Sequence, residues 1–240
     1  MVFSSLVFLC IFLPVTLILY HMLKDIRWKN ALLIIVSLMF YAYGEPVYVF
    51  LMFGSVILNY VSALLIAGNE EKKKFILGIN VFLNLGILGV FKYAVFLVES
   101  LNSIGGINLP VPAITLPIGI SFFTFQAMSY VIDVYRGTVD VQKKFHKVLL
   151  YISFFPQLIA GPIVKYRDIN KQIDERTITA KGSAEGLRRF IWGLGKKVII
   201  SNTMGSVADA VFAADAASVN ILMAWLGAIS YTFQIYFDFN

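Results

Sequence analysis

Polar and ionisable side chains that lie inside long apolar stretches are the residues of this sequence whose types could do chemistry. The set comprises Asn59, Asn80, Asn84, Lys92, Gln126, Asp133, Gln157, Gln234 and Asp238. Surrounding such a group with apolar atoms costs free energy unless the group has a partner. Each of them therefore either hydrogen bonds another part of the protein or marks a path for a polar ligand.

A broken apolar segment holds the first group of candidates. Gln157 follows Pro156, and Gly161 and Pro162 come a few residues later. Because proline lacks an amide hydrogen and disfavours helix before it, a side-chain amide at this place would face exposed backbone or a cavity rather than lipid. We predict that these residues, together with Gln126, line a substrate tunnel.

Gln234 and Asp238 form the second group of candidates. They are one helical turn apart within the aromatic block 231–239. A carboxylate among aromatic side chains needs a partner or water, and the neighbouring sequence offers none. We predict that this pair also lies on the substrate path.

The other polar residues have simpler explanations. Asn80 and Asn84 are one turn apart and predict an interhelical hydrogen bond. Lys92 lies near the end of its apolar stretch, where a lysine can extend its ammonium group to the membrane surface. Asp133 and Arg136 are three residues apart at a helix end and predict a local ion pair.

Motifs of soluble enzymes are missing from the sequence. It has no nucleophile elbow, phosphate-binding loop, zinc-protease motif or dinucleotide-binding fingerprint. His21 and His146 lack a serine or acid at triad-like or metal-like spacing, so we expect solvated side chains and no metal site. Cys10 is the single cysteine, which excludes an intrachain disulfide, and its apolar surroundings predict a buried, inert thiol.

Composition indicates the class of protein that must position these residues. Hydrophobic residues make up 59% and charged residues 14% of the chain, and the mean hydropathy is +0.79. The apolar residues fall in blocks of about 20, the length that a helix needs to cross a bilayer. The net charge of +6 comes from the connections between blocks, a placement typical of membrane topology and not of nucleic-acid binding. The sequence predicts an all-α, polytopic membrane protein with a single transmembrane domain over 1–240.

The connections between blocks set the expected topology. The predicted spans are 2–23, 30–43, 46–67, 75–98, 115–135 and 219–239. Connections 24–29, 68–74 and 136–147 are basic, whereas the loop 99–114 has no Lys or Arg. Because basic connections face the cytoplasm, this pattern places the N-terminus outside. An amphipathic helix over 184–200 is expected to lie along the cytoplasmic interface.

The charge rule fails at one segment. If 148–164 crossed the bilayer, the basic stretch 165–181 would lie outside. Irregular backbone at membrane depth is tolerated only where protein or a water-filled cavity satisfies it. We therefore predict that 148–164 enters and returns on the cytoplasmic side; a proline-kinked crossing that breaks the rule is the alternative.

Several blocks of the sequence match one known family in the same order. They are 116–126 (LPIGISFFTFQ), 130–137 (YVIDVYRG), 154–164 (FFPQLIAGPIV), 193–197 (GLGKK), 224–227 (AWLG) and 231–239 (YTFQIYFDF). With these blocks the chain resembles the membrane-bound O-acyltransferases, in particular the bacterial branch of alginate O-acetylation proteins and of the D-alanine transfer protein of teichoic-acid modification. The resemblance covers nearly the whole chain.

The resemblance implies a fold and an activity. It implies a ring of tilted helices around a central funnel in the bacterial cytoplasmic membrane. Acyl groups, acetyl above all, would pass from a cytoplasmic thioester donor (acyl-CoA or an acyl carrier protein) to an extracytoplasmic cell-surface polysaccharide. It further implies an accessory extracytoplasmic acyltransferase or polysaccharide-modifying protein as partner, and no resident cofactor.

The chain departs from the family pattern at the catalytic histidine. The resemblance implies a histidine that acts on the acceptor hydroxyl and follows the 231–239 block, beyond Asn240. His21 and His146 do not occupy its place. We therefore expect the chain to be the N-terminal part of a longer protein, without catalytic residues of its own and without acyl transfer by itself.

Two other functions stay open at this point. Broken helices and polar groups inside the membrane also suit a transporter or channel, although no inverted repeat is visible. A structural scaffold, in which each polar group is only an interhelical contact, is the third possibility.

Overall fold

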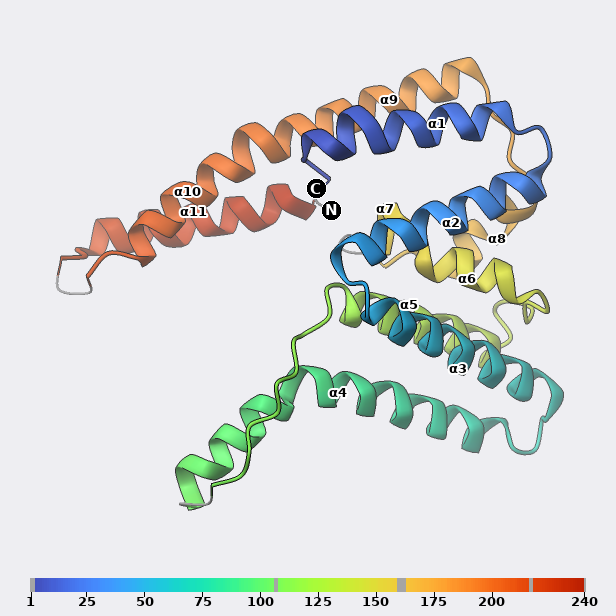
Figure 1. The fold of residues 1–240 in the computed structure, drawn as a ribbon, viewed down its shortest axis with the longest axis horizontal. Coiled ribbons are helices and arrows are strands. Elements are labelled where there is room, and N and C mark those ends of the chain that lie inside the picture. The colour runs from blue at the N-terminus through green and yellow to red at the C-terminus, as the bar shows by residue number, and fades with distance from the viewer. Residues whose placement is uncertain (1–2, 106–107, 159–162, 216–217, 240) are drawn as a thin grey trace. The chain divides into compact units, whose positions relative to one another are not determined.

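The computed structural model describes all residues except 1–2, 106–107, 159–162, 216–217 and 240. The described residues form helices and loops, and no strand occurs among them (Figure 1). The elements are η1 (Phe8–Phe12), α1 (Leu13–Met22), α2 (Ile26–Gly44), α3 (Tyr48–Gly68), α4 (Lys73–Gly105), α5 (Ile120–Tyr135), α6 (Phe145–Ser153), α7 (Phe155–Leu158), α8 (Tyr166–Asp174), α9 (Ala180–Gly195), η2 (Lys196–Ser201), α10 (Asn202–Phe212) and α11 (Ile221–Phe239). The predicted all-α class is confirmed.

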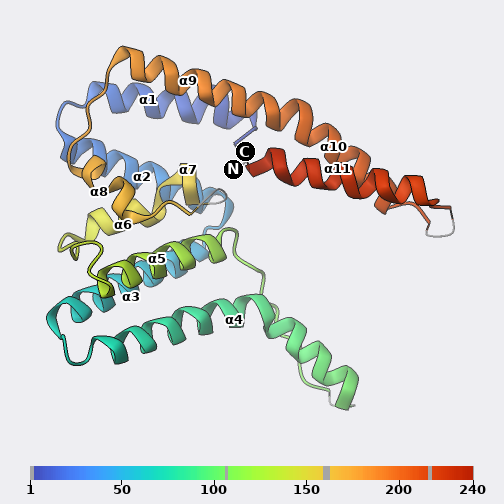
Figure 2. The ribbon, with the colours of Figure 1, turned by 180° about the vertical axis from the view of Figure 1, so that it is seen from behind.

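The chain divides into two compact units. One comprises Val15–Arg176, and the other comprises Val2–Pro14 together with Thr177–Asn240. In the first unit, α3, α4 and α5 pack against one another, and α2 packs against α6 and α7 (Figure 2). In the second, α9, η2 and α10 follow one another without a break, and α11 returns beside them. The single transmembrane domain over 1–240 concerns the assembly of these units and stays a prediction.

Helix α3 shows why these helices pack as they do. Its buried residues recur every three or four positions and form one stripe; they are Met52, Ser55, Val56, Asn59, Ser62, Ala63 and Ile66. Residues at this spacing share one face of a helix. Small side chains in the stripe let the backbone of a neighbouring helix approach closely, so α3 lies in the middle of the first unit's core.

Apolar side chains also cover the outer faces of the helices. On α3, Phe50 is 76% exposed, and on α4 Phe82 is 76% exposed. By length and composition, α3 and residues Lys73–Ile104 of α4 could cross a membrane, and Phe8–Met22 is a shorter apolar helix. Large apolar side chains on so much of the outer surface are unusual for a soluble protein. These outer faces support the predicted membrane environment.

Polar side chains gather on the inner faces instead. Asn59 of α3 donates to Oδ1 of Asn84 at 3.0 Å, and its own Oδ1 accepts from Nδ2 of both Asn80 and Asn84 at 3.1 Å. All three side chains are buried. The predicted interhelical hydrogen bond of Asn80 and Asn84 is confirmed, and Asn59 is its partner.

Three tyrosines attach α8 to the other helices of the first unit. The ring of Tyr166 lies 4.9 Å from that of Tyr130 and 5.2 Å from that of Tyr151, both edge to face. Gln142 links the same rings, because its backbone N–H donates to Tyr130 Oη at 2.9 Å and its Nε2 donates to Tyr166 Oη at 3.0 Å. Tyr166 stands at the start of α8, so this cluster fixes where the polar segment after 164 begins.

The structure differs from the predicted boundaries in several places. Helix α4 continues to Gly105, because the predicted loop 99–114 has no helix-breaking residue before that glycine. Helix α5 begins only at Ile120, after Gly119 with φ +79°, a conformation that favours glycine. The polar helix α8 was not predicted at all. Cys10, predicted to be buried, is exposed on η1.

The asparagine cluster predicts a stability effect. Replacing Asn59 with Ala leaves Asn80 Nδ2 and Asn84 Oδ1 without partners inside the core, so we expect the free energy of unfolding to fall by about 1–3 kcal/mol. The measurement is unfolding in mixed SDS–detergent micelles. The control is Asn69→Ala, an exposed residue that donates only to the carbonyl of Leu65. Equal losses for the two variants would contradict the role of the cluster.

Candidate functional site

The break between α6 and α7 brings together two of the predicted site residues. Helix α6 ends at Ser153, and Pro156 belongs to the short helix α7. Near the end of α6 the carbonyl of Tyr151 has lost the partner that a continuing helix would supply. Gln126 Nε2 donates to it at 2.8 Å and Gln157 Nε2 donates to it at 2.5 Å. The predicted contact of Gln157 with exposed backbone is confirmed.

Two further hydrogen bonds satisfy backbone groups around this break. The backbone N–H of Phe155 donates to Ser37 Oγ on α2 at 3.1 Å. The hydroxyl of Tyr151 donates to the carbonyl of Val164 at 2.8 Å. Pro156 is exposed, whereas Gly161 and Pro162 lie outside the described residues. The amide hydrogens of the two glutamines therefore serve the backbone, and a role of these residues in lining a tunnel stays a prediction.

The second predicted pair lies where α11 packs against η2 and α10. Element η2 is a π-helix, in which the backbone N–H of Asn202 bonds to the carbonyl of Lys197. Short π-helical stretches inside α-helices are frequent at functional sites. Here the π-helical turn directly precedes α10, which packs against α11.

Two glycines allow this approach. A Cβ atom on Gly205 would lie 2.9 Å from Nε2 of Gln234, and one on Gly227 would lie 2.8 Å from Cγ1 of Val211. Real Cβ atoms do not come so close to other heavy atoms. Small residues at both contacts are the usual means by which helices in a membrane pack tightly.

Asp238 finds its partners across this interface. Its Oδ1 accepts a hydrogen bond from Lys197 Nζ in an ion pair, and it lies 2.5 Å from Ser201 Oγ. The Ser201 hydroxyl also lies 3.1 Å from the carbonyl of Gln234, and its one hydrogen can point to either acceptor. Ser201 is fully buried, while the side chains of Lys197 and Asp238 are 35% and 29% exposed. We call Lys197, Ser201, Gln234 and Asp238 the polar cluster.

The polar cluster keeps one unused hydrogen-bonding atom. Oε1 of Gln234 is buried and has no hydrogen-bond partner among the described residues. An unpartnered buried acceptor costs free energy. A polar ligand that donates a hydrogen bond, such as a hydroxyl group, would satisfy it, while the ion pair of Lys197 and Asp238 supplies fixed charges beside it.

Sequence analysis missed Lys197 and Ser201. Lys197 falls within the predicted interfacial helix 184–200, and Ser201 directly follows that helix. A signal was available, because Lys197 and Ser201 are four residues apart, as are Gln234 and Asp238. Two helices that each carry a polar pair at one-turn spacing can pair those faces, but their register cannot be read from spacing alone.

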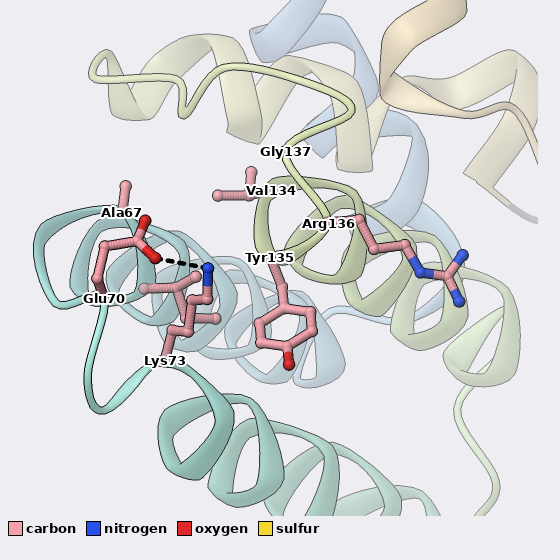
Figure 3. Close-up of a pocket in the computed structure, with 8 residues that line it drawn as sticks. Ala67, Glu70, Lys73, Val134, Tyr135, Arg136 and Gly137 are labelled. Carbon is pink, nitrogen blue, oxygen red and sulfur yellow. Dashed lines mark hydrogen bonds and ion pairs between the residues drawn. The ribbon is translucent and has the colours of Figure 1, made fainter.

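A cavity of about 140 Å³ lies between the α3–α4 turn and the end of α5 (Figure 3). Lys73 Nζ lies 2.5 Å from Glu70 Oε2 and 5.8 Å from the ring centre of Tyr135. Arg136 points away from both charged groups and forms no ion pair with Asp133, so that prediction was wrong. The lysine in this cavity already has its counter-ion, and the cavity carries no candidate chemistry.

The two histidines occupy different surroundings. His21 Nδ1 lies 2.8 Å from the carbonyl of Leu17 one turn earlier. His146 is exposed, and partial burial together with Lys147 and Lys144 lowers its pKa. Both belong to the first unit and neither contacts a serine or acid in a triad-like arrangement within the described residues. Solvated roles at the ends of helices agree with these positions.

The fold and the polar cluster define an integral membrane protein with a charged pair between apolar helices. The model of the membrane-bound O-acyltransferase family matches residues 111–240, more than half of the chain. The chain belongs to this family. The polar cluster and the α6–α7 break both lie inside the matched region.

Several relatives are similar over the whole of this chain. It is 42% identical over 249 residues to a probable alginate O-acetylase, AlgI, of Pseudomonas aeruginosa, with 100% of this chain and 47% of the relative covered. It is 33% identical over 274 residues to a peptidoglycan O-acetyltransferase of Helicobacter pylori, with 100% and 52% covered. A teichoic acid D-alanyltransferase of Bacillus subtilis is 27% identical over 129 residues, covering 51% of this chain and 31% of the relative.

The chain spans about half the length of the first two of these relatives. Family membership supports the acyltransferase prediction and disfavours the transporter alternative. The family is one of membrane-bound proteins, which agrees with the apolar outer faces of the helices.

The ion pair of the polar cluster predicts a coupled stability effect. Lys197→Gln leaves the Asp238 carboxylate with only Ser201 as partner, so we expect a loss of about 1–2 kcal/mol in unfolding free energy. The double variant Lys197→Gln/Asp238→Asn should lose less than the sum of the single variants. The control is Arg189→Gln, which breaks an exposed pair with Glu185 and should cost under about 0.5 kcal/mol. Similar losses for Lys197→Gln and Arg189→Gln would contradict the assignment.

Proposed function

We propose that the protein is an O-acyltransferase component that moves acyl groups, acetyl in the first instance, across the membrane. The donor is a thioester on the cytoplasmic side, and the acceptor is an extracytoplasmic polysaccharide or an accessory protein that modifies one. Family membership supports this proposal. The names of the Pseudomonas and Helicobacter relatives support acetyl as the group, since one is a probable alginate O-acetylase and the other a peptidoglycan O-acetyltransferase.

The observation that carries the proposal is the polar cluster. A lysine–aspartate pair between apolar helices is costly in a membrane and, where it occurs, usually marks a substrate or proton path. Ser201 fixes the Asp238 carboxylate, and Gln234 Oε1 stays free for a ligand. We propose that the polar cluster lines the acyl path and holds the thioester carbonyl or the acceptor hydroxyl by hydrogen bonds.

The proposed donor is acyl-CoA or another acyl thioester, such as one on an acyl carrier protein, and no resident cofactor takes part. The proposed partner is an extracytoplasmic accessory acyltransferase or polysaccharide-modifying protein. The proposed location is the bacterial cytoplasmic membrane, with several crossings and the N-terminus outside.

Contacts at the two ends of the 148–164 segment support its re-entrance. Lys147, just before the segment, forms an ion pair with Asp174 at the end of α8. Gln142 bonds Tyr166 at the start of α8. Helix α6 has nine residues and rises about 13 Å, less than half of a hydrocarbon core of about 30 Å. Both flanks of the segment thus lie together, as a segment that enters and returns on one side requires.

The acyl-transfer proposal predicts a loss of activity in the polar cluster. Asp238→Asn removes the charge that binds Lys197, and we expect the rate of transfer to fall about tenfold or more, the equivalent of one charged hydrogen bond. The measurement is made on a protein that extends this chain to the full length of its relatives, because the chain by itself is not expected to transfer acyl groups. It is the transfer of radiolabelled acetyl from acetyl-CoA to polysaccharide by membranes that hold equal amounts of folded protein. Glu185→Gln, which removes an exposed acid, should keep the rate. An equal rate for the two variants would contradict the site, and no labelled polysaccharide from the unaltered protein would contradict the function.

The re-entrant segment predicts the side on which α8 lies. In a Cys10→Ser background, Lys171→Cys on α8 should react with a membrane-impermeant maleimide only after the cells are permeabilised. Lys72→Cys, in a basic connection, should behave in the same way, and Ser103→Cys near the end of α4 should react in intact cells. Labelling of Lys171→Cys in intact cells would contradict the re-entrant topology and support the proline-kinked crossing.

A further inference from the structure

Arg176, which follows α8, is held in a fixed position in the first unit. Its Nη2 donates a hydrogen bond to Oδ1 of Asn30, and its guanidinium carbon lies 5.7 Å from the ring centre of Tyr20. Asn30 is buried, and its Nδ2 donates to the carbonyl of Ile173 at 2.8 Å. The arginine is therefore part of the junction between α2 and α8, with its planar group against an aromatic face.

The charge of Arg176 is not neutralised by the chain. Within the described residues no carboxylate forms an ion pair with it, and the nearby Asp174 pairs with Lys147. Its Nε is buried without a hydrogen-bond partner. Burial lowers the pKa of Arg176, with the Tyr20 ring as the opposing influence. A half-buried cation without a counter-ion costs free energy that a bound anion would recover.

A second cation lies over the same aromatic ring. Lys29 Nζ is 5.0 Å from the ring centre of Tyr20, and no carboxylate of the described residues pairs with it. The two charged groups thus lie 5.0 and 5.7 Å from one ring centre, and neither has a carboxylate partner among the described residues. The nearest acid in sequence, Asp25, caps α2 by accepting from the backbone N–H of Arg27 at 2.8 Å, so its charge is engaged there.

We propose that Arg176 and Lys29 bind a phosphate group beside Tyr20. The fork of a guanidinium matches two oxygens of a phosphate, and a lysine adds a point charge. Lys29 is the last residue of the basic connection 24–29, and Arg176 is bonded to Asn30 directly after it. Such connections are where anionic headgroups meet a membrane protein. The phosphate is that of an anionic phospholipid or that of a soluble phosphorylated donor such as coenzyme A. The site involves none of the residues of the polar cluster.

Thermal unfolding of the intact chain in neutral detergent tests the proposal. The probes are dioleoylphosphatidylglycerol, coenzyme A and dioleoylglycerol, which has the same acyl chains without phosphate. At least one phosphate-bearing probe should raise the unfolding midpoint, and dioleoylglycerol should not. A response to the phospholipid alone identifies a lipid site, and a response to coenzyme A identifies a donor site. No response to either overturns the proposal.

Variants tie the response to these side chains. Arg176→Gln and Lys29→Gln should each weaken the apparent affinity about tenfold or more, the equivalent of one charged hydrogen bond. Lys29→Gln leaves the bond between Arg176 and Asn30 in place. Its affinity for the phosphate-bearing probe therefore tests the proposal if Arg176→Gln does not fold. The control is Arg167→Gln, which removes the same charge from the exposed face of α8 and should keep the affinity. If Arg167→Gln loses as much affinity as Lys29→Gln, the binding is only general attraction to positive charge and the proposal is wrong.

Discussion

The need of every backbone amide and carbonyl inside a bilayer for a hydrogen-bond partner governs this structure. A helix meets that need internally, and a broken helix does not. At the α6–α7 break the partners come from Ser37 on α2, Gln126 on α5 and Gln157 on α7. The break can exist only where these helices converge. The irregular segment therefore depends on the packing of α2 and α5 around α6.

The same need separates two uses of polar side chains. In the cluster around Asn59, amide groups on α3 and α4 bond mainly to one another, which joins the two helices. In the polar cluster, Asp238 is bonded by a lysine and a serine, while Gln234 Oε1 has no partner. An amide network without charged members mainly adds stability, although Asn80 Oδ1 in it also lacks a partner. A charged pair beside a free acceptor has unused binding capacity, which is why the functional proposal is placed there.

The sequence predicted the helical class, the membrane environment and most helices, because apolar blocks about 20 residues long leave few alternatives. It also predicted that Gln157 meets exposed backbone, since Pro156 breaks the helix there. It did not predict α8, whose polar sequence has no apolar stripe of the usual width and is fixed by Tyr166 against Tyr130 and Tyr151. It could not name Lys197 as the partner of Asp238, because the register of two packed helices depends on contacts such as Gly205 against Gln234.

The proposed re-entrance of 148–164 would account for the junction of α2 with α8. A segment that turns back at mid-depth returns its polar continuation to the side from which it came. There α8 must attach to helices that already end on that side, and Asn30 near the start of α2 provides the attachment through Ile173 and Arg176. With that topology Arg176 lies on the same side as Asn30, which directly follows the basic connection 24–29. Arg176 and Lys29 then lie near one ring without a carboxylate partner among the described residues, which is the basis of the proposed phosphate site.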